Sequence, residues 1–525
     1  MSATPESTAP AWQLLALALL VFLLQLLTCN RFGYYRDELY FLSCGSRLAW
    51  GFVDHPPLTP ALAALAGSVS CGSLFGLRLL PAMNGAVLVL LIGQMTKQLG
   101  GGRFARFLAA VAVLVAPIYL RAHSMLTPAA SETVLWSVAC LLLLRLTRGT
   151  DHQNHRLWLL WGLVTGVGLL NKYNFGFLTV ATLAGMLATA PSRKLLGSRW
   201  PWCGCLLALA LLAPNLIWQL QHGWPTLEFL RNLRTGVLTG VSLPEFVAGQ
   251  VLLLNPLALP LWLAGLIWLL RSRAAARFRF LGWVYLLAFF TYAVGGGKIY
   301  YLAPVYPALM AAGAVAAEQW LAKRQARSAV RLATLYGAGL VLAGMALAPL
   351  GLPVVPIQQM DGYCRTISAG QRETNVLAGH YADMFGWPEL AATVDSLWST
   401  LPAADRSRGL VLAGNYGEAA ALEFFGDKSA ATSGSESPPV ICGHNSYYFW
   451  SRELLESPPS SPRGEVCLAV GPLEDLLRQV YAEVTEIHKV RHPHAVYYEQ
   501  DLPVYLCRWP RESLADVWDR FRHFN

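Results

Sequence analysis

Two stretches near the start of the chain decide its fold. The first is Leu14–Leu27, LLALALLVFLLQLL, which contains no charged residue. The second is the polar loop after it, which includes Tyr34–Tyr40, YYRDELY, and Gly51–Pro57, GFVDHPP. A helix needs roughly 20 predominantly apolar residues to cross a bilayer, and acidic residues at the membrane face are costly and usually functional. This order predicts a membrane-spanning helix followed directly by a functional polar loop.

The composition of the whole chain is that of a polytopic membrane protein. Of its 525 residues, 55% are hydrophobic and only 14% are charged, whereas soluble domains contain about 25% charged residues. Apolar runs recur as far as Leu350, and the remaining sequence has the composition of a soluble domain. The first apolar run is not expected to be a cleaved signal peptide, because Met1–Pro10 contains no Lys or Arg.

Hydropathy predicts about eleven membrane-spanning helices. They are expected at residues 12–29, 77–96, 104–120, 130–146, 157–171, 174–190, 203–219, 247–270, 280–295, 301–320 and 330–350. Lys and Arg cluster in alternate connecting turns, as at Arg145 and Arg148, and the positive-inside rule assigns these turns to the cytoplasm. The same placement accounts for the net charge of +9 without a nucleic-acid partner. We therefore expect a multi-pass protein of the cell (inner) membrane.

The change in composition divides the chain into two domains. Residues 1–354 are expected to form the transmembrane domain, with its main outer loop at residues 30–76. Residues 355–525 are expected to form a small extracytoplasmic, or periplasmic, α/β domain. Within it, Gly409–Ala413 and Val466–Val470 are typical of short buried strands.

Shorter elements complete this prediction. Helical patterns follow the two strands, at residues 418–425 and 473–480, and the Ser-, Gly- and Pro-rich segment 429–439 is typical of a surface loop. In the first outer loop, Pro56-Pro57 precede the apolar segment 58–69. Proline is favourable at a helix start, and the segment is too short to cross a bilayer. It is expected to lie along the outer surface.

Cysteines in the tail leave two interpretations open. An even number in an extracytoplasmic domain allows two disulfides, and buried free thiols fit equally well. The four residues are Cys364, Cys442, Cys467 and Cys507. In the first outer loop, Cys44 and Cys71 can form a further pair.

The adjacent acids Asp37 and Glu38 are candidate catalytic groups. A carboxylate in a partly dry site with cationic neighbours can act as general base on an acceptor hydroxyl or amine. The alternative is that both acids pair with Arg36 and Arg47 and only fix the loop. The residues alone favour neither.

The next polar cluster, Asp54-His55, has three interpretations. Asp54 can orient a substrate while His55 donates to a phosphate. Together with Glu38, the two side chains can also bind a divalent metal, Mg or Mn, because hard cations prefer oxygen ligands. Alternatively, Asp54 caps the proline-led helix that follows.

Several cations are expected on the same outer face. Lys298 follows three glycines, which permit close backbone approach, and lysine is a point-charge partner for phosphate. Lys172, Arg78 and Arg121 are further candidates, although interfacial anchoring explains them equally well. Glu132 is expected at the start of a span, where it either supports the site residues as a further acid or, as we favour, complements the helix dipole with its charge.

In combination, these motifs resemble glycosyltransferase family 39. This family contains polyprenyl- or dolichyl-phosphate-sugar-dependent protein mannosyltransferases and lipid A aminoarabinose transferases, which share the C-type glycosyltransferase fold. The resemblance covers most of the chain. Its segments are residues 36–40, 51–57, 166–173, 213–219, 223–225, 298–301, 415–419 and 443–448.

The resemblance implies an inverting sugar transfer from a lipid-phosphate donor at the outer membrane face. The catalytic pair would be Asp37, as the base or the acid that orients the acceptor, and Glu38, as its partner. The residues implied in substrate binding are Tyr35, Arg36, Asp54, His55, Lys172, Trp224, Lys298, Tyr300 and Tyr301. Family members often have an Asp where this chain has Ala129-Ala130, and Glu132 is the candidate substitute. The acceptor can be a lipid, a glycan or a protein.

Two other classes of protein compete with this interpretation. A transporter or flippase of a lipid-linked sugar would show inverted repeats and broken spans in matched positions, whereas the polar groups here lie on one face. An oligosaccharide ligase or polymerase is expected to have essential arginines and a long outer loop in place of an early Asp-Glu pair. The enzyme is therefore the favoured interpretation.

Overall fold

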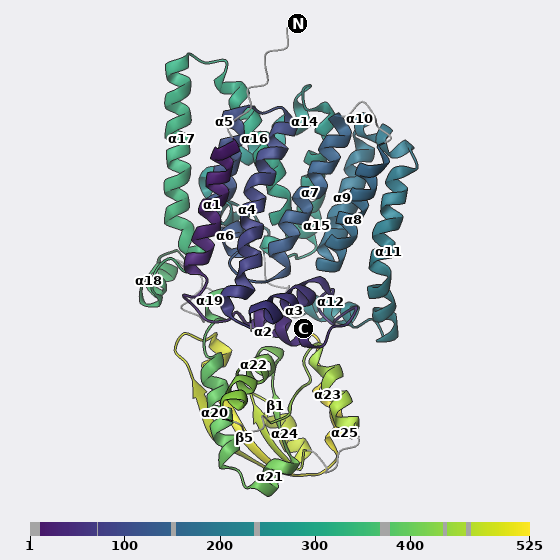
Figure 1. Ribbon diagram of the computed structural model, residues 1–525, viewed down its shortest axis with the longest axis vertical. Coiled ribbons are helices and arrows are strands. Elements are labelled where there is room, and N and C mark those ends of the chain that lie inside the picture. The colour runs from purple at the N-terminus through teal and green to yellow at the C-terminus, as the bar shows by residue number, and fades with distance from the viewer. Residues whose placement is uncertain are drawn as a thin grey trace.

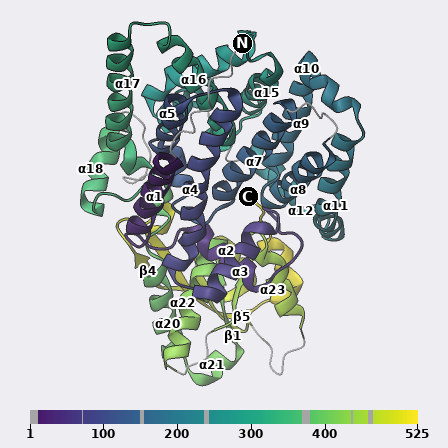
Figure 2. The same cartoon turned by 45° about the horizontal axis from the view of Figure 1, so that its top comes forward.

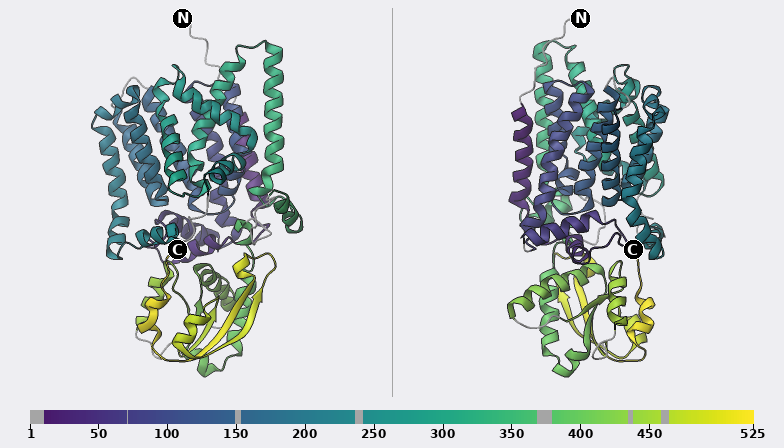
Figure 3. Two further views of the ribbon diagram at one scale, coloured as in Figure 1. Left: turned by 180° about the vertical axis from the view of Figure 1, so that it is seen from behind. Right: turned by 45° about the vertical axis from the view of Figure 1, so that its right-hand side comes forward.

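The protein consists of a helical bundle, a layer of short helices across one end of it, and a tail domain beyond that layer (Figure 1). The computed structural model describes residues 11–70, 72–148, 154–235, 242–367, 379–433, 438–457 and 464–525. The crosswise layer contains α2 (Arg36–Ser46), α3 (Leu58–Ser70) and α12 (Pro225–Thr235). Two further views agree with this order of bundle, layer and tail (Figure 3).

Long apolar helices form the bundle. They are α1 (Ala11–Thr28), α4 (Leu74–Leu99), α5 (Arg103–Leu114), α6 (Pro117–Ala122), α7 (Pro128–Arg148), α8 (His155–Asn171), α9 (Asn174–Ala188), α11 (Trp200–Gln221), α13 (Leu243–Leu253), α14 (Leu259–Arg271), α15 (Phe280–Val294), α16 (Tyr306–Leu321) and α17 (Ala326–Leu347). Within the described ranges, five helical segments are long and apolar enough to cross a membrane, or seven if each of two bent pairs is one span. The polytopic helical class is confirmed, and the count of eleven spans stays a prediction.

Two of the expected spans are interrupted. The expected span 247–270 is bent by 92° between α13 and α14. Asn255 has a φ of 74° at this break and precedes Pro256, and proline disfavours helical backbone in the residue before it. The expected span 104–120 breaks in the same way, because Ala116 is extended before Pro117. The prediction of two continuous helices was wrong at these prolines.

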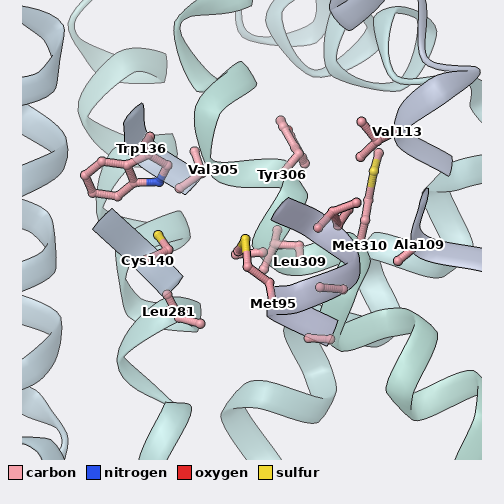
Figure 4. Packing of buried hydrophobic residues seen from close by; sticks show 14 of the residues in the cluster. Met95, Ala109, Val113, Trp136, Cys140, Leu281, Val305, Tyr306, Leu309 and Met310 are labelled. Atoms are coloured by element: carbon pink, nitrogen blue, oxygen red, sulfur yellow. The ribbon is translucent and has the colours of Figure 1, made fainter. Parts of the chain in front are cut away.

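The bundle interior is filled by side chains from helices far apart in the sequence. Trp136 and Cys140 of α7, Leu281 of α15, and Tyr306 and Met310 of α16 lie in one buried cluster (Figure 4). Burying such side chains stabilises the fold by about 25 cal/mol per Å² of apolar surface removed from water. In a bilayer, the close fit of the side chains takes over this role.

The tail domain is built on a five-stranded mixed sheet with the order β2-β1-β3-β5-β4. The strands are β1 (Gly409–Ala413), β2 (Val440–Cys442), β3 (Val466–Val470), β4 (Tyr481–Arg491) and β5 (Asp501–Pro510). β1, β2 and β3 are parallel, whereas β5 is antiparallel to β3 and to β4. The two strands expected from the sequence, β1 and β3, are confirmed.

Helices cover both faces of the sheet. They are α20 (Trp387–Thr400), α21 (Ala403–Arg408), α22 (Tyr416–Ser433), α23 (Tyr447–Glu456), α24 (Glu474–Val480) and α25 (Leu514–Val517). Parallel strands need such crossover connections. The expected loop 429–439 was wrong in its first part, because α22 continues to Ser433. Residues 434–437 of that loop lie outside the described residues.

The first outer loop and the tail domain share one hydrophobic core. Leu39 and Tyr40 of α2, with Phe52, pack in the same buried cluster as Ala420 of α22 and Trp387 of α20. Figure 2 shows α2 and α3 against the tail domain beside α22. The polar loop is therefore held between the bundle and the tail.

Cys442, Cys467 and Cys507 are buried free thiols, which favours thiols over disulfides for these three residues. Cys364 is also buried. Cys44 is also a free, buried thiol. Its suggested partner Cys71 lies outside the described residues.

Candidate active site

A cavity of about 950 Å³ lies between the helical bundle and the tail domain. Its lining comes from three regions: the first outer loop, the ends of bundle helices and the loops of the tail sheet. Of the residues predicted for the site, nine line this cavity: Tyr35, Arg36, Asp37, Asp54, His55, Lys172, Lys298, Tyr300 and Tyr301. Glu38 and Trp224 do not.

Glu38 forms a buried ion pair that fixes the start of α2. Its side chain is 0% exposed, and Arg78 of α4 donates to it with Nη2 at 2.7 Å and Nε at 3.0 Å. The backbone N–H groups of Tyr35 and Leu126 donate to the same carboxylate. Each oxygen therefore already has two donors. This position corrects the prediction of a catalytic role for Glu38.

Asp37, the neighbouring acid, faces the cavity. Its side chain is 31% exposed, and the Tyr416 hydroxyl donates to Oδ1 at 2.9 Å. The Arg36 Nε lies 3.9 Å from the same oxygen. Arg47, the other predicted partner of the two acids, instead pairs with Glu423 of the tail at 2.6 Å. Asp37 is thus the one acid of the pair that can reach a substrate.

The tail domain holds Arg36 in place. Its guanidinium lies 3.6 Å from Asp383 Oδ1 and donates to the Tyr498 hydroxyl. It also lies over the Tyr416 ring, 5.3 Å from the centroid. Burial raises the pKa of Asp383 to about 6. Most contacts of the Arg36 guanidinium are therefore with tail residues.

Asp54 and His55 form a second polar group of the cavity wall. The Tyr40 hydroxyl donates to Asp54 Oδ1 at 3.0 Å, and His55 Nε2 lies 3.8 Å from the same oxygen. The other ring nitrogen, Nδ1, is 3.0 Å from the Pro56 carbonyl, to which it can donate. Burial raises the pKa of Asp54 above its ordinary value. Asp54 thus accepts bonds from side chains, and α3 begins only at Leu58.

The metal-binding set predicted from Glu38, Asp54 and His55 is not assembled, because Glu38 is bound to Arg78. Within the described ranges, no group of three or more His, Cys, Asp and Glu side chains is arranged to hold a metal ion. The reaction step proposed below therefore uses protein side chains alone.

Three cations line the membrane side of the cavity, and they differ in their partners. Lys172 pairs with Glu132 at 3.0 Å and lies over the rings of Tyr300 and Tyr301. Arg121 and Lys298 form no ion pair within the described part of the chain, and both are half-buried. Lys and Arg form strong charge-assisted hydrogen bonds with phosphate, so these two cations are candidate binding groups for an anion.

Two other predicted residues are bonded to nearby protein groups. Glu132 lies beyond the first turn of α7, where it is buried against Lys172 and Asn174. It therefore does not complement a helix dipole. Trp224 is outside the cavity lining, in the turn that ends α11, where its φ is 59° and its N–H donates to the Gln219 carbonyl. Such bonds are typical of helix C-termini.

Sequence reasoning assigned no site residue to the tail domain, which supplies a full wall of the cavity. The contributing residues include Asn415, Tyr416, Glu418, His444, Asn445 and Tyr498. The segments 415–419 and 443–448 carried part of the family resemblance, which was the available signal. Nothing in their local pattern indicated that they face the first outer loop.

Buried carboxyl groups lie behind this wall. Asn415 Nδ2 donates to Glu418 at 2.6 Å and to Glu499 at 2.9 Å. Burial raises the pKa of both glutamates, and their mutual repulsion raises that of Glu418 further. The hydrogen bond from Asn415 favours the charged form of Glu499, so the raised pKa values come from burial and, for Glu418, from the neighbouring charge.

The comparisons with known proteins agree with this architecture. Residues 54–218 match the family described as dolichyl-phosphate-mannose-protein mannosyltransferase. The fold of the whole chain is similar to that of ArnT from Cupriavidus metallidurans bound to undecaprenyl phosphate, with a TM-score of 0.58 and 14% identity over 95% of this chain and 98% of that one. The chain therefore has the C-type membrane glycosyltransferase fold, and the family match covers residues 54–218 of it.

Two other solved structures have a similar fold. For archaeal AglB from Archaeoglobus fulgidus, an oligosaccharyltransferase in complex with an inhibitory peptide and a dolichol-phosphate, the TM-score is 0.50 at 13% identity, over 89% of this glycosyltransferase and 70% of that chain. For the arabinofuranosyltransferase AftD from Mycobacteria, the TM-score is 0.54 at 14% identity. The alignment covers 98% of this chain and 41% of that one. A sequence search among curated proteins finds no match.

The buried pair predicts a stability effect. We expect Glu38→Gln to destabilise this glycosyltransferase by about 3–5 kcal/mol, because it leaves the Arg78 charge buried without its partner. The exposed pair between Arg408 and Glu465 offers a matched control, since exposed pairs contribute about 0–1 kcal/mol. Thermal unfolding of the detergent-solubilised protein measures both. Equal melting temperatures for Glu38→Gln and Glu465→Gln would contradict the structural role of Glu38.

The buried glutamates predict a dependence on pH. A carboxyl group whose pKa is higher in the folded than in the unfolded state contributes stability at low pH, and this contribution is lost as the pH rises through the folded pKa. We therefore expect Glu418 and Glu499 to contribute a fall of the melting temperature as the pH rises from about 5 to about 8. Glu499→Gln should reduce this slope, while Glu465→Gln should leave it unchanged. A steeper slope in Glu499→Gln would contradict the assignment.

Proposed function

We propose that this glycosyltransferase moves a sugar from a polyprenyl-phosphate donor to an acceptor in the cavity, on the outer face of the cytoplasmic membrane, with inversion at the anomeric carbon. The observation that carries the proposal is the pairing of groups on one cavity: the carboxylate of Asp37 with the unpaired cations Arg121 and Lys298. Asp37 is close enough to Lys298 for the two charges to interact.

The cations support binding of the donor phosphate. Phosphate forms charge-assisted hydrogen bonds with Lys and Arg, which are about twice as strong as neutral ones. Apolar residues lie on the same membrane side of the cavity, among them Ile118, Leu253 and Leu350. An isoprenoid chain can pack against them while its phosphate contacts Arg121 and Lys298. Related folds with bound undecaprenyl phosphate and dolichol-phosphate support this donor class.

The reaction needs one base and a stabilised leaving group. In the proposed step, an acceptor O–H or N–H gives its proton to Asp37 as the acceptor atom attacks the anomeric carbon. The bond from that carbon to the phosphate oxygen breaks, and its electron pair leaves with the lipid phosphate. Positive charge near this oxygen stabilises the transition state. Lys298 and Arg121 are placed to supply that charge.

Other predicted contacts keep narrower roles in this proposal. His55 and Lys172 lie on the cavity wall but are already bonded to protein groups. The rings of Tyr35, Tyr300 and Tyr301 offer apolar faces for the donor sugar. Arg36 and Asp54 shape the wall around Asp37 rather than carry charge to the phosphate.

The distribution of basic residues supports the outer-face assignment. Pro128 at the start of α7 lines the cavity, so Arg145 and Arg148 at its other end lie on the opposite side of the bundle. By the positive-inside rule, that opposite side is cytoplasmic. The cavity and the tail domain are then extracytoplasmic. A site at one end of the bundle also favours an enzyme over a flippase, whose site would lie near the bilayer midplane.

The assignment of the base has a direct test. We expect Asp37→Asn to lower transfer by at least about 100-fold, the usual contribution of a general base. The measurement is mass spectrometry of glycolipids and glycoproteins from a deletion strain complemented with each variant. Asp501→Asn is a control, because Asp501 is 68% exposed in a pair at the end of the β4–β5 hairpin. Near-normal transfer by well-folded Asp37→Asn would refute the assignment.

The donor-phosphate site has a second, independent test. We expect Lys298→Met to weaken binding of undecaprenyl phosphate by about 10- to 100-fold, because a charge-assisted contact is lost. Lys323→Met is the matched control, since this exposed lysine follows α16 at the far end of that helix. Fluorescence titration of the protein in nanodiscs measures both affinities. Equal affinities would contradict a phosphate site at Lys298.

A further inference from the structure

The loops after all three parallel strands of the tail sheet open into the cavity. Asn415 follows β1, His444 and Asn445 follow β2, and Pro472 and Leu473 follow β3, and each of these residues lines the cavity. In open α/β sheets, ligands bind outside the carboxyl ends of the strands at the point where the strand order reverses. The tail therefore presents the end of its sheet that is suited to binding.

The positions of the tail helices show that the strand order reverses between β1 and β3. α22, which follows β1, packs in one core cluster through Ala419 and Ala420. α24, which follows β3, packs in the other cluster through Leu477 and Val480. The two helices thus cover opposite faces of the sheet. Their first turns separate at the carboxyl ends of β1 and β3, next to the cavity.

From this arrangement we infer that the tail domain binds the acceptor at the carboxyl ends of β1, β2 and β3, and that the recognised part of the acceptor is an uncharged, hydroxyl-rich group, as in a saccharide. This inference rests on the proposed function and assigns the acceptor to a different wall from the donor. The cations for the donor phosphate are on the membrane side, and the strand-end loops form the tail side.

The chemistry of the tail wall supports an uncharged group. The described tail residues that line the cavity include no Lys or Arg. Burial lowers the pKa of His444 to about 3, so its imidazole stays neutral. His444 Nδ1 and Asn445 Oδ1 are buried and have no protein partner within the described residues. Buried polar groups normally have partners, so these two atoms are free to accept hydrogen bonds from hydroxyl groups.

Exposed aromatic rings extend the same wall. Tyr497 and Tyr498 are about half exposed, and their rings are 5.1 Å apart. Sugar rings have apolar faces, and aromatic side chains combine apolar area with a polar handle. A ligand pocket with apolar and aromatic walls and a few placed polar groups is the usual form of a small-molecule site.

Tyr416 connects this wall to the catalytic acid. Asn415 Oδ1 accepts the N–H groups of Gly417 and Glu418 at 2.9 and 3.1 Å, which caps α22 and fixes Tyr416 in its first turn. The Tyr416 hydroxyl then donates to Asp37. An acceptor hydroxyl held by the strand-end loops is therefore directed toward Asp37 by the same segment.

The test uses Asn445→Gly in the full-length protein. Asn445 has a φ of 48°, a conformation that glycine adopts without strain. Membranes of the deletion strain serve as the acceptor source, and the donor lipid of that strain is titrated separately. We expect the half-saturating amount of acceptor membranes to rise at least tenfold, with the half-saturating amount of donor unchanged. Tyr447→Phe, at the start of α23 but outside the cavity, is the control expected to match wild type.

Three outcomes would overturn the inference. One is an unchanged acceptor titration in Asn445→Gly, and another is a shift in the donor titration alone. The third is a product in which the sugar is attached to a phosphorylated group, which mass spectrometry of the product identifies. Failure of the proposed function itself is recognised separately, because Asp37→Asn would then retain transfer.

Discussion

The buried ion pair between Glu38 and Arg78 determines how the first outer loop is presented to the cavity. It joins the first turn of α2 to α4, and Arg78 also donates to the carbonyls of Cys29 and Gly33. The end of α1, the start of α2 and the body of α4 are thereby held together. Because consecutive helical residues point about 100° apart, burying Glu38 turns Asp37 outward. The pair is structural, and its consequence is the position of Asp37, the carboxylate that we propose as the base.

The tail domain completes the site that this pair begins. The core shared by α2 and α22 brings Tyr416 to Asp37, and Asp383 and Tyr498 to Arg36. Gly417 allows this close approach, since a Cβ there would lie 2.5 Å from Arg36 Cγ. The membrane domain alone would leave the cavity open on one side. The groups are therefore separated in space. The cations lie on the membrane wall of the cavity, the neutral polar groups lie on the tail wall, and Asp37 lies between them.

Much of the fold was predictable because its causes are local. Apolar length predicted the long helices, and short β-branched and aliphatic runs predicted β1 and β3. The strands β4 and β5 were missed because much of β4 is exposed and β5 contains two prolines, so neither has a clear pattern of burial. The bend at Asn255-Pro256 was missed because hydropathy alone cannot show where a proline interrupts an apolar run.

The site was predictable in part for the same reason. Asp37, His55 and Lys298, which line the cavity, could be singled out because charge is rare in the apolar part of the chain. The difference between Asp37 and Glu38 depends on Arg78, 40 residues away, and no local pattern encodes that contact. The sequence could not decide between the two interpretations of Glu132, because its partner Lys172 is equally remote. The tail wall could not be predicted, because it forms only where the two domains pack together, and sequence periodicity carries no information on that packing.

The central claim is that one outer-face cavity holds both the donor phosphate and the acid that activates the acceptor. The most direct test is a cryo-EM structure of the full-length protein in nanodiscs with undecaprenyl phosphate. We predict phosphate density within hydrogen-bonding distance of Lys298 or Arg121, in the cavity that Asp37 lines. Phosphate bound away from both cations, with the Asp37 cavity empty, would contradict the account.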